Sequence, residues 1–145
     1  MKCILFCKAC GRPLSRVVTI VSGDAPGVTP PEMRDEQPIM PSGSAFKSHE
    51  PWILPKAWLL SGNKQPYLSY VPQIWMNLDD LLGEARYTPH TGRLSGCCGL
   101  SDGDGPNRIC ECGNHIGTEF SECDTPRMFV PDPSLTRWED VEEVS

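Results

Sequence analysis

Apolar residues in this chain occur in short runs that are separated by turn-forming residues. Residues 2–7 and 13–21 both fit strands, and the β-branched residues at 17–21 strengthen the second prediction. Residues 114–120 and 127–130 have the same character near the other end of the chain. The pattern therefore predicts a mainly β fold with one or two short helices, built as a small mixed β domain.

Two segments carry helical signals. Residues 77–83 begin with Asn77, a favoured N-cap residue, continue with acids in the first turn and end at Gly83. Residues 133–141 are predicted to form a closing helical turn with Trp138 as its apolar anchor. Because the helix dipole accounts for the acids after Asn77, we do not predict that they form a catalytic pair.

Proline and glycine mark a long insertion in the first half of the chain. The sequence contains 15 Pro and 13 Gly, and seven of the prolines fall within residues 24–55, where apolar periodicity is weak. The length supports a single core, so we predict one domain over residues 1–145. It divides into a cysteine-containing hairpin at 1–23, a Pro-rich loop insertion at 24–55, and the remaining β core with the acidic C-terminus at 56–145.

Two cysteine pairs have the pattern of half-sites for a metal ion. Residues 7–11, the first knuckle, read Cys-x-x-Cys-Gly, and residues 110–113, the second knuckle, read Cys-x-Cys-Gly. In such a half-site a tight turn aims both sulfurs at one ion, and the glycine permits the positive φ that closes the turn. We predict a structural Zn²⁺ bound by four thiolates, those of Cys7, Cys10, Cys110 and Cys112.

The second knuckle is one residue shorter than the usual Cys-x-x-Cys, and this leaves alternatives open. Cys97, Cys98 or Cys123 could replace one of the predicted ligands, and the same cysteines with His115 are candidates for a second site. The vicinal pair Cys97 and Cys98 is also a candidate redox pair. Adjacent cysteines in a strand point to opposite faces, so thiols packed around a single zinc ion remain the simpler interpretation.

The formal net charge is −6, but the two ends of the chain differ in sign. Residues 1–20 contain four cations and no acid, whereas residues 132–145 are strongly acidic. Binding of nucleic acid needs a concentrated basic face, so the overall balance disfavours that class of protein. An acidic surface favours a basic protein as the partner.

The sequence contains neither an export signal nor a membrane span. The apolar residues 4–6 are too few for a signal peptide, and no run approaches the roughly 20 apolar residues that cross a bilayer. We therefore predict a cytoplasmic protein without membrane contact. Eight cysteines in a reducing compartment are typical of metal ligands or buried thiols rather than of disulfides.

Signals for catalysis are weak. A cysteine with His90 or His115 can be drawn as a thiol dyad, but three histidines among eight cysteines make such pairs common by chance. The sequence has no Gly-rich phosphate loop, no nucleophile elbow and no His-Glu-x-x-His motif. We therefore predict that the protein is not an enzyme.

Several short motifs resemble those of small, uncharacterised bacterial zinc-ribbon proteins. These are Gly-Cys-Cys-Gly-Leu at 96–100, Asp-Gly-Pro-Asn at 104–107, the second knuckle, and Gly-Thr-Glu at 117–119 with Cys123. The resemblance covers chiefly residues 92–124 and the first knuckle. It implies zinc ligation by the four knuckle cysteines and a zinc-ribbon-like pair of knuckles that closes the domain, and it brings no established activity.

These observations favour a non-catalytic, zinc-stapled protein that binds another protein. One specific form of this hypothesis is an immunity protein of a toxin system, which would mask a basic toxin domain. A zinc-ribbon protein that assists transcription or binds nucleic acid is an alternative, with Lys2, Lys8, Arg12 and Arg16 as its basic face. A thiol-dependent enzyme that uses Cys97 or Cys98 is another.

Overall fold

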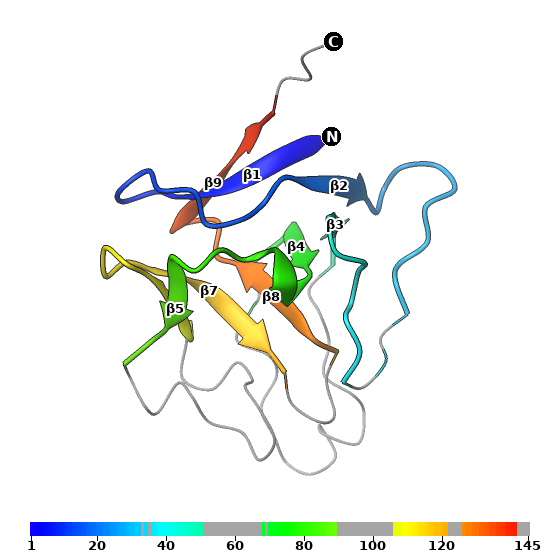
Figure 1. Ribbon diagram of the computed structural model, residues 1–145. Helices are drawn as coiled ribbons and strands as arrows, with labels where there is room; N and C mark the ends of the chain where they lie inside the picture. The colour runs from blue at the N-terminus through cyan, green and yellow to red at the C-terminus, as the bar shows by residue number, and fades with distance from the viewer. Residues whose placement is uncertain are drawn as a thin grey trace.

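The computed structural model describes residues 1–32, 34, 36–50, 68, 70–89, 106–121 and 126–141. Within these ranges nine strands form one mixed, curled sheet, and the only helix is a single 3-10 turn (Figure 1). No helix in these ranges is long and apolar enough to cross a membrane. The elements are β1 (Lys2–Cys7), β2 (Val18–Ser22), β3 (Ser44–Ser48), β4 (Gln73–Met76), η1 (Leu78–Asp80), β5 (Ala85–Tyr87), β6 (Arg108–Cys110), β7 (His115–Phe120), β8 (Met128–Pro131) and β9 (Thr136–Asp140).

The strands lie in the order β5-β6-β7-β8-β4-β3-β2-β1-β9. β2 and β3 run parallel, and every other pair of neighbours is antiparallel. The predicted hairpin is confirmed, because β1 pairs with β2 and Cys3 lies opposite Val18. The strands predicted over 114–120 and 127–130 are confirmed as β7 and β8.

The helical turn predicted over residues 133–141 was wrong. Residues 136–140 form β9, which pairs along its whole length with residues 3–7 of β1 and places Trp138 opposite Leu5. Thr136 is buried, Arg137 is exposed and Trp138 is partly buried, so burial alternates at the start of β9 as it does in a half-buried strand. The segment is extended because the free edge of β1 offers backbone hydrogen bonds that local helix signals do not outweigh.

The short helix predicted over residues 77–83 is present only as the 3-10 turn η1. Asn77 caps it as predicted, since its side-chain oxygen accepts a hydrogen bond from the backbone N–H of Asp79 at 2.8 Å. The turn goes no further because Leu81 is extended and forms an isolated β-bridge with Ser15. The carboxylate of buried Asp80 accepts hydrogen bonds at 2.8 Å from a loop at residues 42–43.

The sheet buries apolar side chains on both faces. The inner core includes Leu5 on β1 and Cys110 on β6, strands far apart in the strand order, so it fills the inside of the curl. The outer core lies on the other face, around Phe46, Trp75 and Phe120. Ile39 and Met40 from the Pro-rich segment cover this outer core. That segment was predicted as a loop insertion, but it also contains β3, a strand in the middle of the sheet.

Candidate metal centre

The structure brings together the four predicted metal ligands from the two knuckles. The sulfur of Cys7 lies 3.6 Å from that of Cys112, and the sulfur of Cys10 lies 3.6 Å from that of Cys110. All four sulfurs lie within 4.8 Å of one another. Sulfurs at about 2.3 Å from a tetrahedral zinc ion are separated by about 3.8 Å, so this cluster is consistent with a structural metal such as zinc.

The first knuckle follows β1 directly. The backbone N–H of Cys7 donates to the carbonyl of Arg12 at 2.9 Å, and the N–H of Gly11 donates to the carbonyl of Cys7 at 2.8 Å. Gly11 has a φ of 75°, in the left-handed region that glycine adopts without strain. The closed turn holds the sulfurs of Cys7 and Cys10 on the same side.

The second knuckle repeats these bonds with one residue fewer. The N–H of Cys110 donates to the carbonyl of Asn114 at 2.8 Å, and the N–H of Gly113 donates to the carbonyl of Cys110 at 2.9 Å. Gly113 has a φ of 94°. The turn therefore accommodates the loss of one residue from the usual spacing. β6 and β7, on either side of the turn, form an antiparallel pair.

Each knuckle supplies one buried and one exposed cysteine. Cys7 and Cys110 belong to the inner core and are 0% and 1% exposed, whereas Cys10 and Cys112 are exposed. All four are free thiols. A metal ion held here would sit at the margin of the core, with two ligands anchored in it.

Hydrogen bonds lower the pKa of the Cys7 thiol below the ordinary value for a cysteine. Burial by itself raises the pKa of Cys7, but backbone N–H groups of its own knuckle and the side chains of Cys112 and Asn114 donate to its sulfur, and the pKa falls to about 7. Burial raises the pKa of Cys110 to about 12, and its thiol neighbours add to this effect. The pKa values of the two buried thiols are therefore shifted in opposite directions.

Contacts outside the sulfurs also tie the two knuckles together. Glu111, inside the second knuckle, accepts a hydrogen bond at 2.7 Å from Arg12 beside the first, and it also pairs with Arg86 on β5. The carbonyl of Leu135 accepts from the backbone N–H of Lys8 at 3.0 Å and from the side chain of Asn114 at 3.3 Å. The amide Nδ2 of Asn114 therefore contacts both the Cys7 sulfur and the segment before β9.

The remaining candidate ligands are not part of this cluster or lie outside the described residues. Cys3 is buried on β1, and its sulfur donates to Asp140 at 3.4 Å, in agreement with a packing role. His115 begins β7 and its ring contacts the hydroxyl of Thr88 at 2.9 Å. The positions that lie outside the described residues are His90, Cys97, Cys98 and Cys123.

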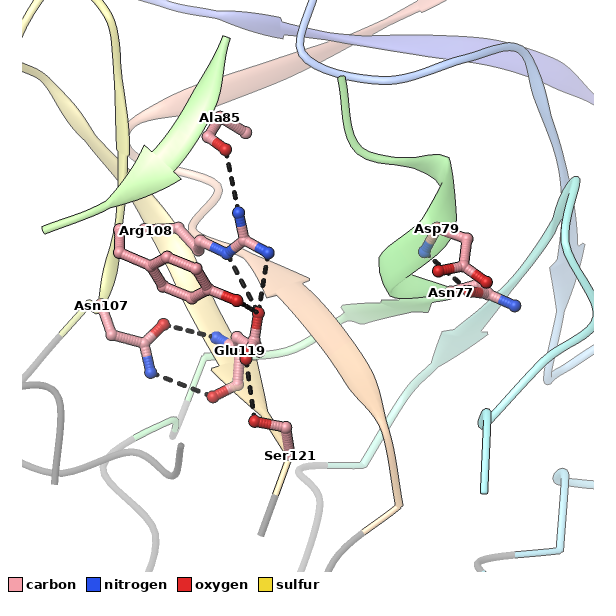
Figure 2. A network of polar contacts seen from close by, with 8 residues as sticks. Asn77, Asp79, Ala85, Asn107, Arg108, Glu119 and Ser121 are labelled. Atoms are coloured by element: carbon pink, nitrogen blue, oxygen red, sulfur yellow. Dashed lines mark hydrogen bonds and ion pairs between the residues drawn. The ribbon is translucent and has the colours of Figure 1, made fainter. Parts of the chain in front are cut away.

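A buried charged network that the sequence analysis missed lies on the strands next to the second knuckle (Figure 2). Glu119 on β7 is 4% exposed and accepts two hydrogen bonds from Arg108 on β6, at 2.7 and 3.1 Å. Arg108 also donates to the carbonyl of Ala85 at 2.9 Å and stacks over the ring of Tyr87, with its central carbon 4.2 Å from the ring centroid. The network joins β5, β6 and β7.

Side-chain amide and hydroxyl groups complete this network. Asn107 donates to the backbone carbonyl of Glu119 at 3.0 Å and accepts from its N–H at 2.7 Å, while Ser121 donates to the free carboxylate oxygen at 2.8 Å. A carboxylate with this many donors is stable in a buried position. Asn107 and Glu119 both fall in the motifs named above, which is the only signal in the sequence that points to them.

No known family, curated protein or solved structure matches the chain. The site is therefore interpreted from its own geometry.

Proposed function

We propose that the protein is a non-catalytic binding protein whose fold is closed by one zinc ion, held by the four knuckle cysteines. The observation that carries the proposal is the convergence of four free thiols from positions about 100 residues apart, with separations close to those of a tetrahedral thiolate site. Four protein ligands leave no open position for water. The ion would therefore contribute folding free energy rather than chemistry.

The partner that we propose is a basic protein. The net charge of −6 makes the protein acidic overall, and electrostatic complementarity speeds association with a cationic partner. Arg12, one of the cations of the alternative nucleic-acid face, is already paired with Glu111. An immunity protein that masks a basic toxin domain is the specific form of this proposal.

Native mass spectrometry of the protein purified gently from its own host tests both parts. We expect a mass that includes one zinc ion and a stoichiometric protein companion with a basic surface. The control is the variant Cys3→Ser, which removes a buried cysteine outside the cluster and should keep the zinc. A protein without metal would contradict the staple, and zinc without any companion would contradict the binding role.

A further inference from the structure

The inner face of the curled sheet is filled at one end and hollow at the other. The inner core packs against β5, β6 and the first knuckle, whereas a hollow of about 620 Å³ opens between β9, β1, β2, β3 and β4. Sites for small molecules in proteins have volumes of this order. The hollow thus has the size of a ligand pocket, and it is separate from the four cysteines, none of which lines it.

Strand register explains why the lining is apolar. Trp138 lies opposite Leu5, so it shares the inner face with the core, and Ile20 and Ile74 pack against the same core. These three side chains continue the inner core into the hollow. Of the four exposed large apolar residues in the described ranges, two, Met1 and Val71, also border it. Exposed apolar side chains that gather in one patch often mark a binding site, whereas scattered ones do not.

Lys47 is one of two cationic side chains in this lining. Lys47 lies on β3, with Ser22 opposite it on β2 and Ile74 opposite it on β4. Its ammonium group makes no hydrogen bond or ion pair with any residue in the described part of the chain. The nearby exposed acid Asp24 accepts a hydrogen bond from Ser22 and is paired with His49 at 3.3 Å. The charge of Lys47 also acts on it from a longer distance, and together these contacts lower the pKa of Asp24. Apolar surface offers the ammonium group no hydrogen-bond acceptor. An anionic group of a ligand that enters the hollow would therefore stabilise the charge of Lys47 by a charge-assisted hydrogen bond.

The opposite wall of the hollow carries its one acid, Asp140 on β9. The Asp140 carboxylate accepts the thiol of Cys3 at 3.4 Å, and β1 and β2 separate it from Lys47 on β3. The only other charged side chain of the lining, Arg137, lies over the ring of Phe6 and donates to Glu139 at 3.2 Å. Asp140 keeps its negative charge at this wall. The cations of the lining that have no described acid within ion-pair distance are Lys47 and the α-amino group of Met1, and of these Lys47 is the side chain on the wall opposite Asp140.

We propose that this hollow binds a small amphiphile with an apolar chain or ring and one carboxylate, the carboxylate meeting Lys47 and the apolar part lying against Ile20, Ile74 and Trp138. This site is independent of the metal centre and goes beyond the proposed protein-binding role. It assigns the protein a small-molecule ligand that either accompanies or regulates its interaction with a partner.

Three probes with the same ten-carbon chain test the proposal: decanoate, decanol and decylamine. Each is titrated into the full-length, zinc-loaded protein by calorimetry, with amide chemical shifts recorded to locate binding. We expect decanoate to bind about tenfold more tightly than decanol, because a charge-assisted hydrogen bond contributes on the order of 1.5 kcal/mol or more. Decylamine should bind most weakly, and shifts should concentrate at the indole N–H of Trp138 and the amide groups of β3 and β4.

Two variants with matched controls complete the test. Lys47→Gln should remove the preference for decanoate over decanol, while Lys8→Gln, which changes a lysine outside the hollow, should keep it. Ile74→Trp should fill the hollow and abolish binding of all three probes, while Val17→Trp adds the same bulk at an exposed position elsewhere. Circular dichroism and thermal unfolding of each variant report whether it has folded.

The proposal fails if no probe binds, or if binding shifts fall outside the hollow. It also fails if decylamine binds most tightly, because Asp140 would then govern the site. A preference for decanoate that survives in Lys47→Gln would contradict the assigned anchor. These outcomes can still be interpreted if Ile74→Trp does not fold, because Lys47→Gln removes the charge without adding bulk to the hollow.

Discussion

The two knuckles reach the same geometry with different numbers of residues. The first closes its turn with a bond from Gly11 N–H to a carbonyl four residues earlier, and the second with a bond from Gly113 N–H to a carbonyl three residues earlier. Both glycines have positive φ, and both knuckles place one sulfur in the core and one in solvent. A half-site is thus defined by its closing bonds and its glycine, and the count of residues between cysteines is secondary.

The strongest test of this equivalence replaces the buried ligand of each knuckle in turn. Cys7→Ser and Cys110→Ser should both abolish zinc binding and lower the free energy of unfolding by about 4 kcal/mol or more, because each removes a ligand and leaves a hydroxyl in the core. Metal analysis and chemical denaturation measure the two effects. Cys3→Ser is the control and should keep the metal. A folded, zinc-loaded Cys110→Ser would show that the shorter knuckle is dispensable.

The exposed ligands should matter less for folding than for affinity. Cys10→Ser and Cys112→Ser should leave the core intact and weaken zinc affinity by more than about 100-fold, since loss of a direct ligand exceeds the effect of losing a group that only supports one. Competition with a chelator of known affinity measures the change. If one of the two variants binds zinc as tightly as the native protein, then another group takes that position and the two knuckles are not equivalent.

The pH dependence of zinc binding should distinguish the two buried sulfurs. The raised pKa values of Cys110 and Cys112 keep these thiols protonated at neutral pH, so zinc must displace their protons and its affinity falls as the pH falls. Cys7, with a pKa of about 7, is a thiolate above that pH and takes up a further proton below it. The loss of affinity should therefore steepen below about pH 7.

Chelator competition between about pH 6 and pH 8.5, corrected for protonation of the chelator, measures this slope. The same slope on both sides of pH 7 would contradict the lowered pKa of Cys7.

The glycines test the turns themselves. Gly11→Ala and Gly113→Ala should each lower the free energy of unfolding by about 1 to 2 kcal/mol, because an added Cβ meets no atom within 4 Å and only the left-handed φ is unfavourable. Gly83→Ala is the matched control, since its Cβ is equally unhindered and its φ is not positive. Thermal unfolding of the zinc-loaded variants measures the difference. A neutral Gly113→Ala would mean that the shorter turn can close in another way.

The smallest effect concerns Glu111, the residue inside the shorter knuckle. Glu111→Gln should lower the free energy of unfolding by about 0.5 to 1 kcal/mol at low salt, because the carboxylate pairs with both Arg12 and Arg86 at a half-exposed position. The effect should shrink at high salt. Glu32→Gln, which breaks the exposed pair with Arg34, is the control and should be neutral. Equal effects in the two variants would remove any special role for Glu111 between the knuckles.

The sequence predicts the local features of this molecule well, because spacing and turn chemistry act over a few residues. The four clustered cysteines, the N-cap at Asn77 and the strands β1, β7 and β8 follow from such signals. The glycine after each cysteine pair is sufficient to locate both turns. Whether the four thiolates hold zinc stays a prediction until metal is measured.

Features that depend on partners far along the chain could not be predicted. Residues 136–140 carry acids that suit a helix as well as a strand, and only the edge of β1 decides between them. Glu119 resembles any surface acid until Arg108 is placed beside it by the pairing of β6 with β7. The hollow around Lys47 needs the curl of the whole sheet, which no local pattern encodes.

The pairing of β1 with β9 also bears on how the chain folds as it is synthesised. β1 is synthesised long before β9, and Cys7 precedes Cys112 by 105 residues in the chain. Until β9 is synthesised, nascent β1 therefore has one edge without its partner strand. During this time the Cys7 thiol is accessible to other metal ions and to oxidants. Native pairing closes a long loop, which slows folding. A zinc ion bound by the four cysteines would therefore be captured late, and it would then hold the strands that carry the two knuckles together.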